Sequence, residues 1–252
     1  MQTLLRKELR EQWRTYRILV VAAVLSLFGL LGPLSVKYLP LIMARMPGVP
    51  EGLAEVMPEP DVAMAVDEYV QNLAGFGVIL AILIPMAAVV GEKNSGTAAM
   101  ILSKPVSRAV FLGSKFITYG LIFFAGILLA GLGGYYYLGI LFEWLKPAGF
   151  LALNGLLMIY LMMFMAITLF ASTVSRSQFA AAGISFSLLI FISLLGTIPS
   201  LSPHLPTSLI DWGCALALRL DAEPAWTALA VTVAVTALAW LTAWLILQRQ
   251  EL

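Results

Sequence analysis

The chain has 252 residues, of which 61% are hydrophobic and only 12% are charged. A soluble domain carries about 25% charged residues, because polar surface must cover its core. With a mean hydropathy of +0.94, this composition excludes a soluble globular domain and a disordered chain, and it indicates an integral membrane protein. The net charge of +1 gives no basic excess, so we expect no nucleic-acid partner.

Residues 1–17 are the first predicted element, a helix in the membrane interface. Its apolar face holds Leu5, Leu9, Trp13 and Tyr16, a neighbouring basic stripe holds Arg6, Arg10, Arg14 and Arg17, and the far flank holds Glu8 and Glu11. An apolar face beside a basic one, at ~100° per residue, is typical of a helix lying in the inner interface. Two interpretations stay open: an ordinary positive flank of the first span, or a surface helix that also touches a cytoplasmic partner.

Six uncharged stretches are each long enough for one membrane-spanning helix, which needs ~20 apolar residues. Within them we expect spans at approximately 18–36, 70–91, 116–138, 150–172, 180–199 and 225–247. The stretches are continuously apolar rather than alternating, which favours helices over a β-barrel. The first is too long for the apolar part of a cleaved signal peptide. The sequence therefore predicts an all-α fold, with one transmembrane domain over residues 1–252.

The basic residues set the predicted orientation. With the N-terminus inside, 11 of the 15 Lys and Arg residues fall on inner segments and 4 on outer ones. This asymmetry follows the positive-inside rule, so we expect both termini in the cytoplasm and the chain in the plasma membrane. No charged residue falls in the middle of a span, which disfavours ion-coupled transport and proton pumping.

Two outer segments are predicted not to cross the membrane. Residues 37–68 are rich in proline and acidic residues, so we expect an irregular connector, partly helical near 62–70, with a ligand-binding lid as the alternative. Residues 201–223 form a half-apolar segment around Asp211, which fits a helix dipping into the outer interface or a re-entrant hairpin.

The loop between spans two and three, residues 91–108, is the most informative segment. Gly96 suits a tight turn, Thr97–Leu102 can form a short helix with a mostly apolar surface, and Pro105 ends it. Ser107 is a suitable N-cap for the helix that runs into span three. A short apolar helix thus projects into the cytoplasm without a core of its own, and exposed apolar surface of this kind usually marks a contact site.

Several kinds of chemistry are absent from the sequence. It contains no P-loop and no dinucleotide-binding glycine motif after a strand. The single cysteine, Cys214, and the single histidine, His204, cannot build a disulfide framework or a Cys/His metal site. We expect Cys214 to be a small apolar side chain and His204 to be solvated. The chain is therefore predicted to hold no catalytic site, metal or cofactor.

The inner loop resembles a signature of permease subunits of type-2 ABC transporters. The matching residues are Glu92-Lys93-Asn94-Ser95-Gly96-Thr97, then Leu102-Ser103-Lys104-Pro105-Val106-Ser107-Arg108, then Leu112-Gly113-Ser114-Lys115-Phe116. Arg6-Lys7-Glu8-Leu9 is similar to the family's N-terminal surface helix. Residues 172–183 are similar to its inner turn between spans four and five, and residues 206–212 to its stretch before the last span.

The resemblance implies a permease that pairs with a second permease, identical or homologous, above two cytoplasmic ATPase subunits that bind ATP and magnesium. It implies that the N-terminal helix and the inner-loop helix are the mechanical contacts, and that the protein is an exporter. The residues expected to carry the coupling are Glu92, Gly96, Thr97, Leu102, Pro105 and Arg108. Of these, Glu92 and Arg108 are candidates for ion pairing or helix capping.

Two other classes of function are alternatives to a transporter subunit. A membrane scaffold or assembly factor without transport activity is compatible with the lack of charged residues within the spans. An intramembrane enzyme would need paired acids or histidines there, which the sequence lacks. A P-loop ATPase reading frame beside this one would favour the transporter. The residues do not specify the cargo, although apolar span walls with a few hydroxyls suit an amphipathic or lipid-like molecule.

Overall fold

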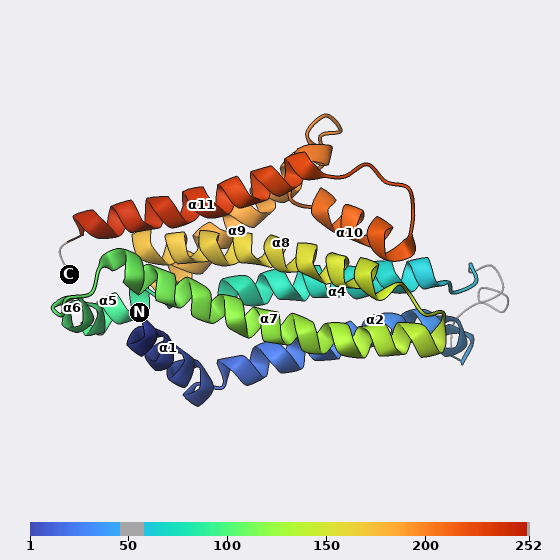
Figure 1. The fold of residues 1–252 in the computed structure, drawn as a ribbon, viewed down its shortest axis with the longest axis horizontal. Coiled ribbons are helices and arrows are strands. Elements are labelled where there is room, and N and C mark those ends of the chain that lie inside the picture. Colours follow the sequence, from blue (N-terminus) through green and yellow to red (C-terminus); the bar gives the residue numbers. More distant parts are fainter. Residues whose placement is uncertain (46–57, 251–252) are drawn as a thin grey trace.

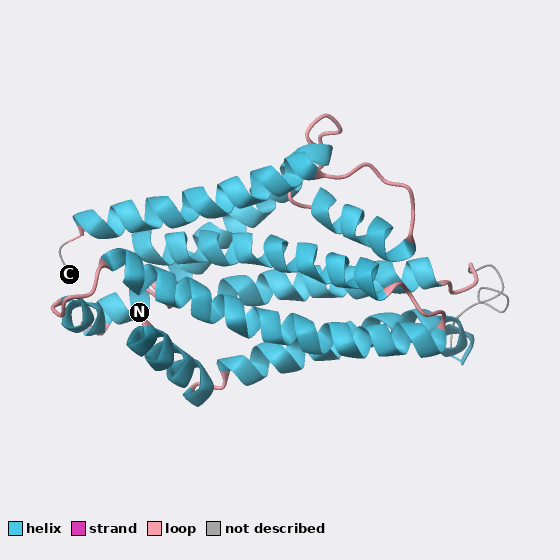
Figure 2. Ribbon diagram, viewed as in Figure 1, coloured by secondary structure: helices cyan, strands magenta, loops and turns pink. Residues whose placement is uncertain are grey.

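The computed structural model describes residues 1–45 and 58–250. Within them, six helices are long and apolar enough to cross a membrane, which confirms the predicted all-α fold (Figure 1, Figure 2). The long helices are α2 (Arg17–Arg45), α4 (Val62–Leu83), α7 (Arg108–Leu141), α8 (Pro147–Val174), α9 (Gln178–Leu195) and α11 (Trp226–Arg249). The shorter helices are α1 (Gln2–Arg14), α5 (Val90–Asn94), α6 (Thr97–Leu102), α10 (Ser208–Leu218) and the 3-10 helix η1 (Ser202–His204).

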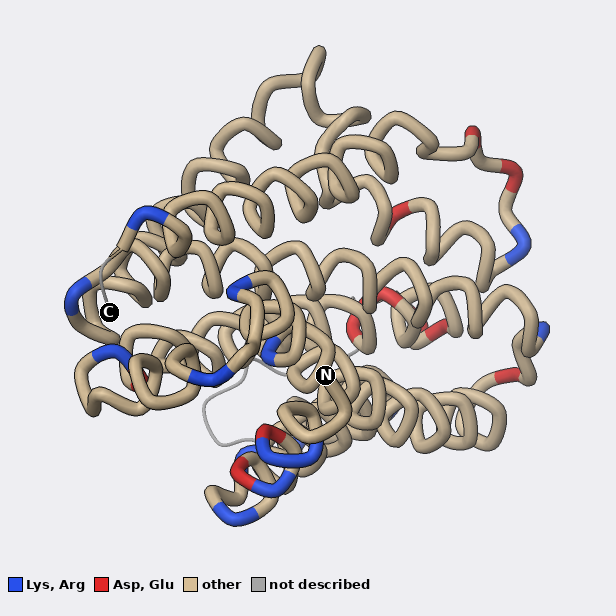
Figure 3. Tube along the Cα trace, turned by 60° about the vertical axis from the view of Figure 1, so that its left-hand side comes forward, with Lys and Arg blue, Asp and Glu red and all other residues tan. Residues whose placement is uncertain are grey.

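The long helices run side by side along the long axis of the molecule, and three short ones gather at one end. The start of α1, the helices α5 and α6 and the end of α11 lie at this end in Figure 1. We call it the inner end, after the orientation predicted from the basic residues, and the opposite end the outer end. Figure 3 shows Lys and Arg concentrated around the inner end, as that prediction requires.

Helix α8 is the centre of the bundle. It packs against α4, α7, α9, α10 and α11, while α2 packs on α4 and α7. In the most apolar stretch of α8, 67% of the residues are buried, against 17% in α9 and 11% in α11. Most of the surface of α9 and α11 is therefore left for lipid or for another subunit.

The second spanning helix lies earlier in the chain than the range 70–91 expected from the sequence. Its first turn is capped by Asp61, whose Oδ1 accepts a hydrogen bond from the backbone N–H of Met64 at 2.7 Å. At its other end α4 stops at Leu83, because Pro85 has no backbone N–H to continue the ladder. The expected range was bounded by charged residues, but a charge does not end a helix; here Asp61 caps the start of α4, and its end lies two residues before Pro85.

The first spanning helix runs further than the expected range 18–36. α2 continues to Arg45 with Pro33 and Pro40 inside it, so the residues from 37 to 45 are helical rather than an irregular connector. Prolines are tolerated in membrane helices because neighbouring groups satisfy the freed carbonyls. Helix α4 covers the part near 62–70 that was expected to be helical. The remainder of that predicted connector, residues 46–57, lies outside the described residues.

The segment before the last span forms the predicted short helix. α10 lies along the outer half of α8 (Figure 1), and two glycines allow the close approach. A Cβ at Gly213 would lie 2.7 Å from Leu153 Cδ1, and a Cβ at Gly149 would lie 2.3 Å from the carbonyl oxygen of Leu216. Cys214 is half-buried on this helix.

Candidate functional site

The loop between α4 and α7 presents the short helix that the sequence predicts. Gly96 has a φ of +72°, a left-handed conformation that glycine adopts without strain, and α6 follows it directly. Ala98 is 1% exposed and Leu102 packs against the core, whereas Met100 is 63% exposed. One face of α6 therefore rests on the bundle, and the other presents an apolar side chain at the inner end.

The segment after α6 is held by a cap and by the last helix. Pro105 is exposed and follows the end of α6 at Leu102. The Ser107 Oγ accepts a hydrogen bond from the backbone N–H of Val110 at 3.3 Å, which confirms Ser107 as the N-cap of α7. Arg108 Nη1 donates to the carbonyl oxygen of Leu247 in α11. Arg108 thus ties the start of α7 to the end of α11, and it forms no ion pair with any residue that the structure describes.

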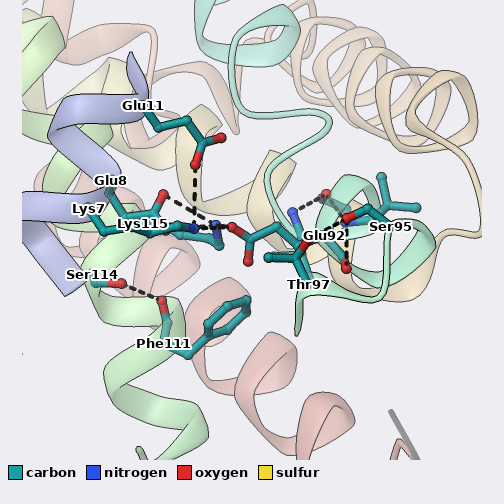
Figure 4. Close-up of polar contacts among 12 residues, drawn as sticks. Lys7, Glu8, Glu11, Glu92, Ser95, Thr97, Phe111, Ser114 and Lys115 are labelled. Atoms are coloured by element: carbon teal, nitrogen blue, oxygen red, sulfur yellow. Dashed lines mark hydrogen bonds and ion pairs between the residues drawn. The ribbon is translucent and has the colours of Figure 1, made fainter. Parts of the chain in front are cut away.

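Glu92, at the start of the same loop, joins a cluster of ion pairs with α1 and α7 (Figure 4). Its Oε1 lies 2.5 Å from Lys7 Nζ and 3.1 Å from Lys115 Nζ. Lys7 also pairs with Glu8 at 3.0 Å and with Glu11 at 3.4 Å, and Lys115 pairs with Glu8 at 3.2 Å. We call these five residues the inner-end cluster. It connects α1, the loop between α4 and α7, and the third spanning helix.

Three residues of the inner-end cluster are buried, whereas the side chains of Lys7 and Glu11 are 36% and 40% exposed. Glu8 is 1% exposed, Lys115 2% and Glu92 9%. Burial alone would lower the pKa of Lys7, but its hydrogen bond to Glu92 and the charges of Glu8 and Glu92 outweigh burial and raise that pKa above its usual value. Because the pKa of Lys7 is higher in the folded chain than in the unfolded one, the charge of Lys7 stabilises the fold fully at pH values below the unfolded pKa. This stabilisation is lost only at strongly alkaline pH. Lys7 therefore stays charged through the physiological range.

Lysines supply the positive charge between the three carboxylates of the cluster. Oxygens of Glu8, Glu11 and Glu92 lie within 4.8 Å of one another, and the ammonium groups of Lys7 and Lys115 lie among them (Figure 4). Lys115 Nζ also sits 5.0 Å from the centre of the Phe111 ring, a cation–π contact. Within the part of the chain that is described, the buried Glu92 Oε2 has no hydrogen-bond partner.

Helix α1 has three faces, and the one that packs on the protein is polar. Gln12 is fully buried and its Nε2 donates to the hydroxyl of Tyr119 in α7 at 3.3 Å; Glu8 lies on the same face. The predicted interfacial residues occupy the other two faces. Leu5 and Leu9 are half-buried, Trp13 is 71% exposed, and Arg10 and Arg14 are exposed.

The loop is also anchored to α8, through α5. Lys93 Nζ donates to the carbonyl oxygen of Thr173 at 2.8 Å, and burial lowers the pKa of Lys93. A cation at this position stabilises the C-terminal end of α8, because that end carries the negative pole of the helix dipole. The Ser172 Oγ accepts the backbone N–H groups of Val89 and Val90, each at 3.1 Å. These contacts fix the residues on both sides of Glu92 against the fourth spanning helix.

The comparisons with known proteins agree with this arrangement. A family model described as "ABC-2 family transporter protein" matches residues 2–252. This chain belongs to the ABC-2 transporter family. It is also 30% identical over 197 residues to YxlG of Bacillus subtilis (strain 168), which is described as an uncharacterized transmembrane protein. The aligned part covers 77% of this chain and 75% of that relative. The resemblance drawn from the inner loop is thereby confirmed at the level of the family.

The structure of this ABC-2 protein brings together residues that sequence reasoning kept apart. The sequence indicates Glu92 from its loop, but it places Glu8 and Glu11 only on the far flank of the N-terminal helix, and Lys7 and Lys115 only within the motifs that resemble the family. The available signal was an acidic pair on a helix rich in arginine, at positions that are i,i+3 along one face. Carboxylates that face neither the apolar nor the basic side of such a helix need a partner elsewhere.

Proposed function

We propose that this ABC-2 protein is a permease subunit on which a separate cytoplasmic ATPase acts through α6. The supporting observation is the pairing of an exposed apolar contact with a buried ionic anchor. Met100 faces away from the bundle, and Glu92, just before α6, is paired with lysines of α1 and α7. A surface that receives force needs such an anchor, because a freely moving loop would absorb the displacement.

The contacts around α6 determine which helices would move if α6 were displaced. A shift of the loop pulls on α1 and α7 through the Glu92 pairs and on α8 through Lys93. A shift on the other side of α6 reaches α11 through Arg108. Gly96 and Pro105 shape the turns between these anchors. Movement of α6 is therefore distributed to four helices of the bundle and does not stay in the loop.

The remaining parts of the proposal concern the assembly. ATP and magnesium bind in the ATPase, of which two copies act beneath a pair of permeases, identical or homologous. The exposed faces of α9 and α11 are available for the second permease or for lipid. We further propose that the chain lies in the plasma membrane with both termini in the cytoplasm, and that transport is outward. The rival reading is a membrane scaffold that holds a partner without moving a substrate.

The first prediction concerns the exposed side of α6. Met100→Asp places a charge at the centre of the apolar contact without disturbing the bundle, because this side chain is 63% exposed. We expect the proposed partner ATPase to be lost from the purified complex, with loss of its stimulated activity. Co-purification and ATPase assays of the reconstituted complex measure both effects.

Leu220→Asp is the matched control, because Leu220 is 61% exposed at the outer end and should leave the complex intact. Unchanged co-purification and unchanged ATPase stimulation in Met100→Asp would contradict the proposed function. A partner that stays bound, with ATP hydrolysis that never depends on this chain, would support the scaffold instead.

A further inference from the structure

We propose that the exposed face of α1 binds the headgroups of anionic phospholipids in the leaflet at the inner end. The face is defined by Arg6, Arg10 and Arg14, one helical turn apart, with Trp13 beside them. All four side chains are exposed. The three arginines form no ion pair with any described residue, so their charge is directed outward.

The neighbouring lysine shows why these arginines are distinct from the inner-end cluster. Lys7 is on the same helix but is held by Glu8, Glu11 and Glu92. A groove of about 420 Å³ runs along the edge between the two sets and is lined by Lys7, Arg10, Glu11, Arg14 and Thr15. Three of the lining side chains, Lys7, Arg10 and Arg14, are cations, and only Glu11 is a carboxylate. The groove presents net positive charge to its occupant.

The position of α1 in the chain favours a lipid surface as that occupant. Only Thr15 and Tyr16 separate α1 from the first spanning helix, and Tyr16 has a positive φ of 58° that turns the chain. The helix therefore cannot leave the membrane boundary. Trp13 is 71% exposed and Tyr16 69%, and exposed aromatic side chains at this depth are typical of the headgroup region.

An acidic protein surface is the competing occupant, and the apolar face decides against it. Leu5 and Leu9 lie between the buried polar face and Trp13, so that apolar, aromatic and basic side chains follow one another around the helix. This order matches the acyl, interfacial and phosphate layers of a bilayer. Basic residues close to an anionic leaflet each add to the attraction, which decays within a Debye length.

Lipid bound to this face would also affect the loop between α4 and α7, through the contacts of α1. α1 is joined to Glu92 through Lys7, and to α7 through Gln12, so that anchoring α1 fixes one side of the inner-end cluster. This link to transport rests on the proposed function, whereas the lipid binding itself does not. The experiment below therefore measures binding by the full chain alone.

The test compares lipids retained by the purified protein. The full chain is incubated in mixed micelles with equal amounts of phosphatidylglycerol and phosphatidylcholine, washed, and its bound lipids are quantified by mass spectrometry. We expect wild type to retain phosphatidylglycerol preferentially, and the variant Arg6→Gln/Arg10→Gln/Arg14→Gln to lose about tenfold or more of that preference. Added inorganic phosphate should not compete, since a free anion lacks the acyl chain.

The matched control removes three positive charges from the inner end and leaves α1 unchanged. Lys104, Arg176 and Arg249 are exposed at the inner end but lie off α1, so Lys104→Gln/Arg176→Gln/Arg249→Gln should keep the preference. Equal retention of the two lipids by wild type would overturn the proposal, as would an equal loss in the control. Competition by phosphate would show an ordinary anion site, and an unchanged lipid preference in Arg6→Gln/Arg10→Gln/Arg14→Gln would show that this face does not bind the lipid.

Discussion

Lys115 is the residue on which the inner-end cluster depends. It is 2% exposed and lies between Glu8 at 3.2 Å and Glu92 at 3.1 Å. Without it, two buried carboxylates would keep only Lys7, which is more exposed than they are. Removing one partner of a buried pair is far more costly than the pair itself is favourable, because the remaining charge stays in a poorly solvated site.

We therefore expect Lys115→Met to destabilise the protein by about 3–5 kcal/mol. The measurement is thermal unfolding of the full chain in detergent, followed by intrinsic fluorescence. Adding Glu8→Gln to Lys115→Met should recover part of the loss, since it removes a carboxylate that the first change leaves unpaired. Lys146→Met, an exposed lysine at the outer end, should change the stability little. Equal destabilisation by both single variants would show that the cluster is not a special site.

Local signals predicted single residues well, and long-range pairs poorly. Gly96 and Ser107 could be assigned because a left-handed turn and an N-cap are set by the neighbouring residues. The pair of Glu8 and Lys115 joins residues 107 positions apart, and no local pattern specifies such a contact. Glu92 was identified from its loop, but its role became visible only with the partners that packing brings to it.

At the scale of an element, the contact between α8 and α10 depends on the lack of a side chain at Gly149. α10 approaches α8 closely at Gly149, where a Cβ would meet the backbone of Leu216 at 2.3 Å. A backbone atom cannot give way as a flexible side chain can, so one of the two helices has to move. Overpacking of this kind costs about 1–3 kcal/mol.

Gly149→Ala should accordingly loosen α10, and Cys214 reports on this directly. It is the only cysteine of the chain and lies half-buried on α10, so we expect its reaction with a maleimide to become faster in the variant. Gly155→Ala is the control within the same helix, because a Cβ there has no neighbour within 4 Å, and alanine favours a helix. Equal maleimide rates in wild type and Gly149→Ala would mean that α10 is not seated on this glycine.

The helices themselves could be predicted from apolar length, and their ends could not. Six apolar stretches became six long helices, because satisfying backbone groups in lipid leaves few alternatives to a helix. The range expected for the second span was displaced, since Asp61 and Pro85 set its ends rather than the charges at either side. By contrast, α2 continues through Pro40, although proline was expected to mark irregular structure there, because neighbouring groups in a membrane bundle can satisfy the carbonyl that a proline leaves free.

At the scale of the whole molecule, the distribution of charge and the position of α6 have to agree with one orientation. The start of α1, the helix α6 and the end of α11 lie at the same end (Figure 1), and basic residues are concentrated there (Figure 3). An ATPase that uses cytoplasmic ATP can reach α6 only if this end faces the cytoplasm. The proposed function therefore requires the predicted orientation, and the opposite orientation would exclude it.

Single cysteines introduced at the two ends test this orientation. In a Cys214→Ser background, Ser103→Cys lies after α6 and Ser200→Cys lies before η1, and both positions are exposed. In intact cells, a maleimide that does not cross membranes should label Ser200→Cys and leave Ser103→Cys unlabelled until the cells are opened. The basic residues at the inner end favour this result, because they are retained on the cytoplasmic side during insertion. Labelling of Ser103→Cys in intact cells would place α6 outside, where neither an ATPase nor its ATP could act on it.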